Sequence, residues 1–306
     1  MTALLKWMTA NPVQAFLAAG LAALCAMLPV PAAWLPGAVV AFCLLVGGLP
    51  AAAAAMGGAT LACLWALAPA FGTLPALAVA LALLLPALLA AVALEKSRSL
   101  SVAFQALTLG CCLLVLAING LLGDPVRALA PVIEKLEPML RQLADAFSRA
   151  GIDKTPEELG EQTASLAWAT FGWMVLFNAF VAQCAALWGY GRLREPGLFG
   201  REFRALRLGA AVAWLLAALF VATLVSGATG GGGWQAADDL QFVLAAAFLV
   251  QALAVVHGLR ELQVIGVVPL VLAYVAVVLV PMALVGIGFA DTWVRFRERF
   301  APRQGV

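Results

Sequence analysis

The chain has 306 residues, of which 64% are hydrophobic and only 11% are charged. A soluble globular domain carries about 45–50% apolar and about 25% charged residues, so the composition excludes that class of protein. The formal net charge of +2 excludes the strongly basic surface that nucleic-acid binding requires. At about 20 apolar residues per crossing, the length predicts an all-α transmembrane bundle of eight to ten membrane helices plus amphipathic interfacial helices. We expect residues 1–306 to form a single integral membrane domain.

Nine apolar runs are the candidate membrane spans, and nearly every charged residue falls between them. They cover residues 12–29, 33–48, 50–70, 73–94, 100–122, 165–190, 206–226, 240–258 and 264–289. The first run leads into further apolar sequence without an A-x-A cleavage site, so we expect a retained helix rather than a signal peptide. The second run is short, and Gly47, Gly48 and Pro50 predict a turn after it.

The middle of these runs contains no Asp, Glu, Lys or Arg. Proton-coupled transporters place ionisable residues inside the bilayer, so the sequence disfavours that class. The chain lacks GxSxG, HExxH and Walker patterns, and its single histidine, His257, disfavours catalytic triads and histidine-based metal sites. We therefore expect a protein that is not an enzyme and has no cofactor or metal. The six cysteines lie in apolar runs without a CxxC spacing, which favours a packing role.

Lysine and arginine predict which loops are cytoplasmic. The basic link 191–207 contains five arginines, and the link 95–98 contains Lys96 and Arg98, so both are predicted to be cytoplasmic. The stretch 124–164 has eight acidic and five basic residues, and the glycine-rich turn 227–239 has two acidic residues and no basic one. Both are predicted to lie outside. This spacing places the N-terminus in the cytoplasm.

The basic C-terminal tail, residues 291–306, conflicts with a count of nine crossings. Nine crossings would leave the tail outside, whereas its four arginines favour the cytoplasm. The last apolar run would be about 39 Å long as one helix, which is more than one crossing needs. A break near Pro281 would remove the conflict, and so would an early segment that does not cross.

The stretch 124–164 contains an amphipathic helix. Its apolar residues recur at helical spacing from Leu129 to Phe147, with charged residues on the other faces and an expected kink at Pro138. This extracytoplasmic helix is either a surface element packed on the bundle or the outer leaflet, or a lid over a substrate path.

A second helix start follows in the same stretch. Thr155, Pro156 and Glu158 match an N-cap, a first-turn proline and a capping box. The helix is expected to run without interruption into the span that begins at Ser165. Further on, the glycine run 230–233 predicts a flexible turn.

Two segments on the predicted inner side carry aromatic residues at helical spacing among arginines. They contain Phe199, Phe203 and Leu206 in the basic link, and Trp293, Phe296 and Phe300 in the tail. Such helices anchor a protein at the headgroup region. The alternative is a docking surface for a cytoplasmic partner, formed in the link by Arg201, Arg204 and Arg207.

Few polar side chains lie within the spans, and a buried amide in lipid must find a partner. They are Gln14, Gln105, Asn119, Asn178, Gln183, Gln241, Gln251 and His257. Hydrogen bonding between helices is the default interpretation. The alternative is a ligand pocket formed by Asn178, Gln183, Gln251 and His257. On the first helix, Ala15, Ala19 and Ala23 form a small-xxx-small row that permits close approach of another helix.

Several motifs resemble the YybS-like family of bacterial membrane proteins. They are EPG at 195–197, GREFRALRLG at 200–209, QALAVVH at 251–257, ADTW at 290–293 followed by Phe296 and Arg297, and the NGLLGDP corner at 119–125. The resemblance covers the whole chain by hydropathy and specific motifs from about Asn119 onward. It implies a multi-pass protein of the bacterial inner membrane. The family is distantly similar to the substrate-binding components of energy-coupling-factor transporters, in which an alanine row docks the coupling subunit; Ala15, Ala19 and Ala23 are the matching positions.

Two function hypotheses follow. The first is a non-catalytic, small-solute-binding membrane subunit that needs a separate energising partner, which agrees with the missing Walker motif. The second is a scaffold or assembly protein of the cell envelope that docks partner proteins through its Arg-aromatic helices. In both, the lipid bilayer is the main environment of the chain.

Overall fold

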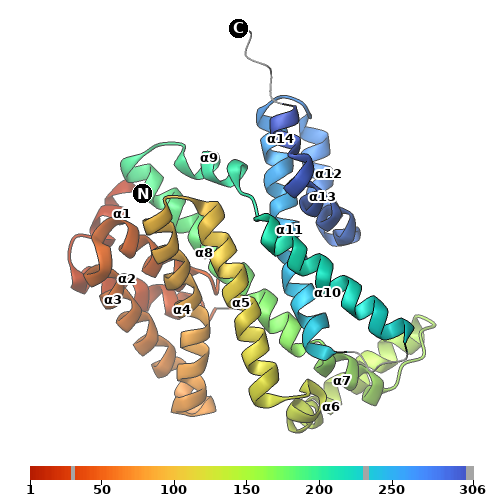
Figure 1. Ribbon diagram of the computed structural model, residues 1–306. Coiled ribbons are helices and arrows are strands. Elements are labelled where there is room, and N and C mark those ends of the chain that lie inside the picture. Colours follow the sequence, from red (N-terminus) through yellow and green to blue (C-terminus); the bar gives the residue numbers. More distant parts are fainter. Residues whose placement is uncertain (29–31, 230–233, 301–306) are drawn as a thin grey trace. The chain divides into compact units, whose positions relative to one another are not determined.

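The computed structural model describes residues 1–28, 32–229 and 234–300, and every regular element in these residues is a helix (Figure 1). The all-α prediction is confirmed for this part of the chain. The predicted glycine turn at 230–233 and Arg303 of the tail lie outside the described residues. The chain forms two compact units. Unit 1 comprises Met1–Gly110, Val175–Ala213 and Ala245–Val306, and unit 2 comprises Cys111–Met174 and Trp214–Leu244.

The helices are α1 (Thr2–Met8), α2 (Pro12–Cys25), α3 (Leu35–Phe71), α4 (Thr73–Ser97), α5 (Leu100–Leu122), α6 (Pro125–Arg149), α7 (Pro156–Ser165), α8 (Ala167–Arg194), α9 (Leu198–Ala205), α10 (Ala210–Ala228), α11 (Gln235–Glu261), α12 (Val267–Leu279), α13 (Pro281–Val294) and α14 (Phe296–Arg299). Four of them, α5, α8, α10 and α11, contribute to both units.

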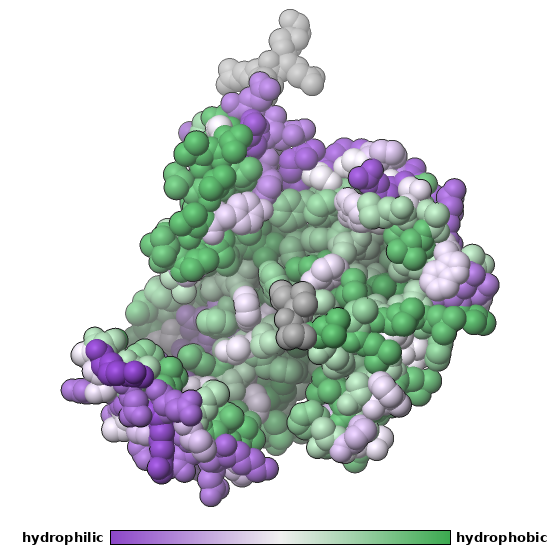
Figure 2. Space-filling view, turned by 180° about the vertical axis from the view of Figure 1, so that it is seen from behind, coloured by the Kyte–Doolittle hydropathy of each residue, from purple (hydrophilic) through white to green (hydrophobic). Residues whose placement is uncertain are grey.

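Six helices are long and apolar enough to cross a membrane, namely α3, α4, α5, α8, α10 and α11. Two bent pairs, α1 with α2 and α12 with α13, raise the number to eight if each pair is one span. Hydrophobic residues cover much of the face drawn in Figure 2, and hydrophilic ones gather over α6 and α7 of unit 2 and over α9 and α14 of unit 1. These are the helices of a multi-pass membrane protein. The described residues support six to eight spans, and the predicted count of eight to ten is not confirmed.

The predicted runs 33–48 and 50–70 form the single 37-residue element α3, which explains part of the lower count. A straight helix of this length would measure about 55 Å, nearly twice the hydrocarbon core of about 30 Å. Gly48 interrupts the helix with φ 71° and ψ −170°, a conformation open only to glycine. The predicted turn is therefore present as a break inside α3.

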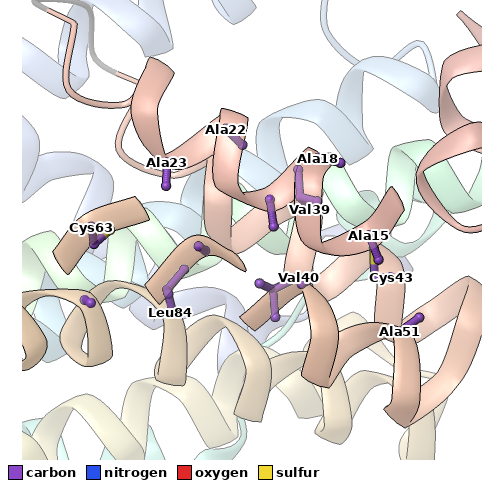
Figure 3. Packing of buried hydrophobic residues seen from close by; sticks show 14 residues of the cluster. Ala15, Ala18, Ala22, Ala23, Val39, Val40, Cys43, Ala51, Cys63 and Leu84 are labelled. Atoms are coloured by element: carbon purple, nitrogen blue, oxygen red, sulfur yellow. The ribbon is translucent and has the colours of Figure 1, made fainter. Parts of the chain in front are cut away.

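The alanine row of α2 packs inside unit 1. Ala15, Ala19 and Ala23 are completely buried, and they share one apolar cluster with residues of α3 (Figure 3). A Cβ atom on Gly58 of α3 would lie 2.1 Å from the backbone oxygen of Phe16, so only glycine permits this crossing. The row is covered by α3, and docking of a partner to it would require α3 to move.

The last apolar run breaks at Pro281, which is one of the two alternatives that the sequence left open. α12 ends at Leu279, α13 begins at Pro281, and the two axes are bent by 117°. Proline has no N–H with which to continue the helix, and Val280 leaves helical geometry at φ −141° and ψ 56°. The run is therefore a broken span or a re-entrant hairpin.

Helices α6 and α7 pack together in unit 2. Leu140 and Ala144 of α6 contact Leu159 of α7, and α6 remains one helix through Pro138. The predicted capping box is confirmed. The Glu158 N–H donates to Thr155 Oγ1 at 3.2 Å, and the Thr155 N–H donates to Glu158 Oε2 at 3.0 Å.

The prediction that this helix runs uninterrupted into the next span is wrong, because α7 ends at Ser165 and α8 begins at Ala167. A continuous helix needs a bond from the Ala169 N–H to the Ser165 carbonyl. In the structure, the Ser165 carbonyl accepts from Gln235 Nε2 at 2.7 Å, and the Ala169 N–H interacts with Asp239. Side chains of α11 therefore replace the helical bond.

Candidate functional site

The four residues predicted to form a ligand pocket make different contacts. Gln183 donates from Nε2 to the Ala87 carbonyl, His257 Nε2 lies 2.8 Å from the Tyr274 hydroxyl oxygen, and Asn178 is half-buried. The two cavities described below are lined by none of the four. Two of the contacts join helices, as the default interpretation predicts for buried polar groups.

Gln251 belongs to a polar cluster in unit 1 that we call the Asp291 centre, formed by Asp291, Arg297, Arg207 and Gln251. Asp291 is 0% exposed, and its Oδ2 accepts from Arg297 Nη2 at 2.7 Å and from Gln251 Nε2 at 3.3 Å. Arg207 Nε lies 3.7 Å from the same oxygen, and the Phe296 N–H donates to Oδ1 at 3.0 Å. The carboxylate is thus paired with cations and hydrogen-bonded at both oxygens.

The Asp291 centre joins three segments that are far apart in the sequence. Arg297 also donates to the carbonyls of Arg204 and Leu206, and Gln251 accepts from the Leu208 N–H at 2.6 Å and donates to the Gly288 carbonyl at 2.8 Å. Burial lowers the pKa of the Arg297 guanidinium, and the neighbouring Asp291 opposes this effect. The centre ties the basic link and α11 to the C-terminal helices.

The arginines predicted to dock a partner have partners within the chain. Arg204 forms an ion pair with Glu261 at 3.5 Å, Arg207 pairs with Glu298, and Arg201 pairs with Glu195. Of these three ion pairs, only the one between Arg201 and Glu195 has both side chains about half exposed. The arginines of the basic link are therefore largely occupied by contacts within the chain, which disfavours the interpretation of the link as a docking surface.

A second buried carboxylate lies in unit 2, in what we call the Asp239 centre, formed by Asp239, Asn119 and Gln235. Asp239 is 1% exposed, and its carboxylate accepts from Asn119 Nδ2 and from Gln235 Nε2, both at 3.0 Å. Within residues 1–28, 32–229 and 234–300, no Lys, Arg or His forms an ion pair with it. Asp239 is therefore a buried acidic group held by neutral donors.

Each of the two side-chain amides in this centre already donates both of its N–H groups within the chain. Asn119 Nδ2 also donates to the Val115 carbonyl at 3.0 Å, and Gln235 Nε2 also donates to the Ser165 carbonyl at 2.7 Å. A side-chain amide has two N–H donors and one carbonyl acceptor. Each amide can consequently offer only its carbonyl oxygen to a ligand.

A cavity of about 420 Å³ adjoins these amides, and we call it the Asp239 cavity. It is lined by Leu116, Asn119, Gly120, Gly123, Asp124, Trp234, Gln235 and Ala236. The Trp168 indole N–H donates to the Gly123 carbonyl at 3.2 Å, which fixes one wall. Asp124 caps α6 through the Val126 N–H at 2.9 Å and remains half-exposed. Asp239 itself does not line the cavity. The lining combines the amides of Asn119 and Gln235 and the Asp124 carboxylate with the indole ring of Trp234, whose N–H is a donor.

Sequence reasoning missed both centres. It placed Asp239 in an outer turn and Asp291 in the tail, whereas the structure places them in α11 and α13. Gln235 and Asp239 are four residues apart, which is the spacing of neighbours on one face of a helix. This spacing could have indicated that the helix begins near Gln235 rather than at residue 240. Asn119, in contrast, was recognised as a polar residue within a span.

No family model, curated protein or solved structure matches the chain. The site is therefore interpreted from its own chemistry.

Proposed function

We propose that the protein is a non-catalytic membrane subunit that binds a small cationic solute carrying N–H donors, such as an organic ammonium ion, in the Asp239 cavity. The observation that carries this proposal is a buried carboxylate, without an ion pair among the described residues, that is hydrogen-bonded to two amides lining a cavity. A ligand with N–H groups complements the amide carbonyl oxygens of Asn119 and Gln235 and the Asp124 carboxylate, and its positive charge complements the acidic site.

The energetics of burial support the same ligand class. A buried ionised carboxylate costs several kcal/mol unless an opposite charge or hydrogen bonds compensate it. The amides compensate part of this cost for Asp239, and a bound ammonium ion supplies the missing charge. The cavity is within the range of about 300–1,000 Å³ typical of small-molecule sites.

The resemblance to the YybS-like family extends the proposal. Its distant similarity to energy-coupling-factor substrate-binding components implies a bacterial inner-membrane protein that captures a solute and relies on a separate energising partner. We place the N-terminus in the cytoplasm and the Asp239 cavity on the outer side, in keeping with the distribution of Lys and Arg.

Thermal unfolding of the full chain in detergent tests the proposal. Ethylammonium and tetramethylammonium carry the same charge, but only ethylammonium has N–H donors. A ligand at about 100 times its Kd adds about 2.7 kcal/mol, and each kcal/mol raises Tm by about 2–4 °C in a large domain. At matched ionic strength, we expect ethylammonium to raise Tm more than tetramethylammonium does.

Asp239→Asn is the test variant and Asp238→Asn the matched control. Asp238 is the adjacent residue, carries the same charge and is exposed. The ethylammonium response should vanish in Asp239→Asn and persist in Asp238→Asn. Equal responses in the two variants, or equal effects of the two cations on the wild-type chain, would contradict the proposal.

A second candidate function is an envelope scaffold, and α6 is the feature that favours it. Val132, Leu136 and Met139 are exposed on this helix although they are apolar. Co-purification from native membranes distinguishes the two functions. An ATPase-containing transport complex supports the solute-binding subunit, and envelope-synthesis proteins support the scaffold.

A further inference from the structure

A separate cavity in unit 1 lies between α3 near its break at Gly48, the C-terminal ends of α4 and α8, and α9, and we call it the Arg98 cavity. Its volume is about 290 Å³, just below the range of about 300–1,000 Å³ typical of small-molecule sites. Apolar walls come from Leu45, Leu94, Leu187 and Leu198, and polar groups from Glu95, Arg98, Tyr190, Glu195 and Glu202. The cavity therefore combines a leucine wall with charges of both signs.

Two of the charged groups are available to a ligand. Glu202 is engaged with the Leu100 N–H at 2.9 Å, and Glu195 is paired with Arg201. Glu95 and Arg98 form no ion pair with any residue in the part of the chain that the structure describes. One unpaired carboxylate and one unpaired guanidinium thus line the same cavity.

The neighbouring residues of α8 have the character of a membrane interface. The Arg192 guanidinium lies 5.5 Å from the ring centroid of Trp188, which is itself exposed. Tryptophan, tyrosine and arginine gather where a helix passes from hydrocarbon to headgroups. Tyr190, between these two residues, lines the cavity.

We propose that the Arg98 cavity binds a phosphoethanolamine group, with Arg98 on the phosphate and Glu95 on the ammonium. Arginine matches phosphate oxygens through paired N–H donors, and carboxylates accept from a primary ammonium. A choline headgroup has no N–H to donate and is recognised by aromatic cages, whereas this cavity contains a single aromatic ring. The leucine wall suits the glycerol and first acyl carbons of a phospholipid.

Lipid retention by the full chain tests this proposal independently of the Asp239 cavity. The protein is reconstituted in nanodiscs that contain equal amounts of phosphatidylethanolamine, phosphatidylcholine and phosphatidylglycerol, and the lipids that remain bound are quantified by native mass spectrometry. We expect about tenfold enrichment of phosphatidylethanolamine, the ratio expected for one charge-assisted hydrogen bond. Equal retention of the three lipids by the wild-type chain would exclude a phospholipid as the source of the group.

Variants assign the effect to the cavity. Glu95→Gln and Arg98→Gln should each reduce the enrichment to near one. Lys96→Gln is the matched control, because Lys96 lies on the same helix end and does not line the cavity. A loss in the control as large as in the two variants would show general surface electrostatics and overturn the assignment.

A final experiment distinguishes a phospholipid headgroup from free phosphoethanolamine as the ligand of the cavity. Calorimetric titration of the detergent-solubilised chain with free phosphoethanolamine detects a site for the soluble group. Binding there that Arg98→Gln removes indicates a soluble ligand, and enrichment of the lipid without such binding indicates a phospholipid. If neither occurs, the proposal is wrong.

Discussion

Units 1 and 2 each bury one aspartate, and the two carboxylates have different surroundings. Asp291 meets two guanidinium groups, with Arg297 at 2.7 Å and Arg207 at 3.7 Å. Asp239 is equally buried and is held by the amides of Asn119 and Gln235. A buried charge is stable when its surroundings compensate it, so the Asp291 centre is electrostatically complete and the Asp239 centre is not.

The comparison separates a polar cluster that stabilises the fold from one that can accept a ligand. The Asp291 centre joins the basic link, α11 and the C-terminal helices through bonds to backbone as well as side chains. The Asp239 centre adjoins a cavity with unused carbonyl oxygens. Substitutions should therefore change stability at the first centre and ligand response at the second.

The largest effect is expected for Asp291→Asn. The substitution leaves Arg297, which is 9% exposed, without its buried counter-charge. Removing one partner of a buried ion pair costs about 3–5 kcal/mol, and denaturant titration in mild detergent measures the loss. In a double-mutant cycle with Arg297→Met, the two losses should not add, because both variants remove the same pair. Additive losses would show that the pair is not the stabilising interaction.

A smaller loss is expected for Gly288→Ala, next to the same centre. A Cβ at this position would lie 2.0 Å from the Phe248 carbonyl oxygen, so α13 and the backbone of α11 would have to separate. Such overpacking costs about 1–3 kcal/mol. Gly286→Ala on the same helix is the control, since its Cβ meets nothing within 4 Å. Equal stability of the two variants would contradict the close crossing.

Asp239→Asn should change the free energy of unfolding by less than about 1 kcal/mol. Loss of one hydrogen bond is offset by removal of an uncompensated buried charge. The same denaturant titration as for Asp291→Asn provides the measurement. A destabilisation as large as that of Asp291→Asn would remove the distinction between the two centres.

The smallest effect is a pH dependence at the edge of the Asp291 centre. A hydrogen bond from Arg207 holds the pKa of Glu298 below its ordinary value of 4.5. The carboxylate therefore contributes stability above pH 4.5, and this contribution is lost as the pH falls through the lower pKa of the folded protein. Because Glu298 is exposed, the effect on Tm should be slight. Comparing Tm at pH 6 and below pH 4 should give a smaller difference in Glu298→Gln; an identical difference would contradict this role.

Local signals predicted much of the fold. The capping box of Thr155 and Glu158 and the breaks at Gly48 and Pro281 each depend on a few adjacent residues, and the structure contains all three. Hydropathy predicted the membrane helices, and the span 100–122 has the predicted ends.

The two aspartate centres could not be predicted in the same way, because their contacts cross long stretches of the chain. Asn119 and Asp239 are 120 residues apart, and Arg297 reaches the Leu206 carbonyl across 91 residues. The spacing of apolar residues along the chain gives no information about contacts between distant segments. Asp239 and Asp291 were also assigned to loops, because each lies near a helix end beside other charged residues.

The most direct test of the central claim is infrared difference spectroscopy of the full chain on addition of ethylammonium. The account predicts a change in the carboxyl bands of the wild-type protein that persists in Asp238→Asn and is absent from Asp239→Asn. Spectra without a carboxyl change, or with the same change in Asp239→Asn, would show that the bound cation does not act on Asp239.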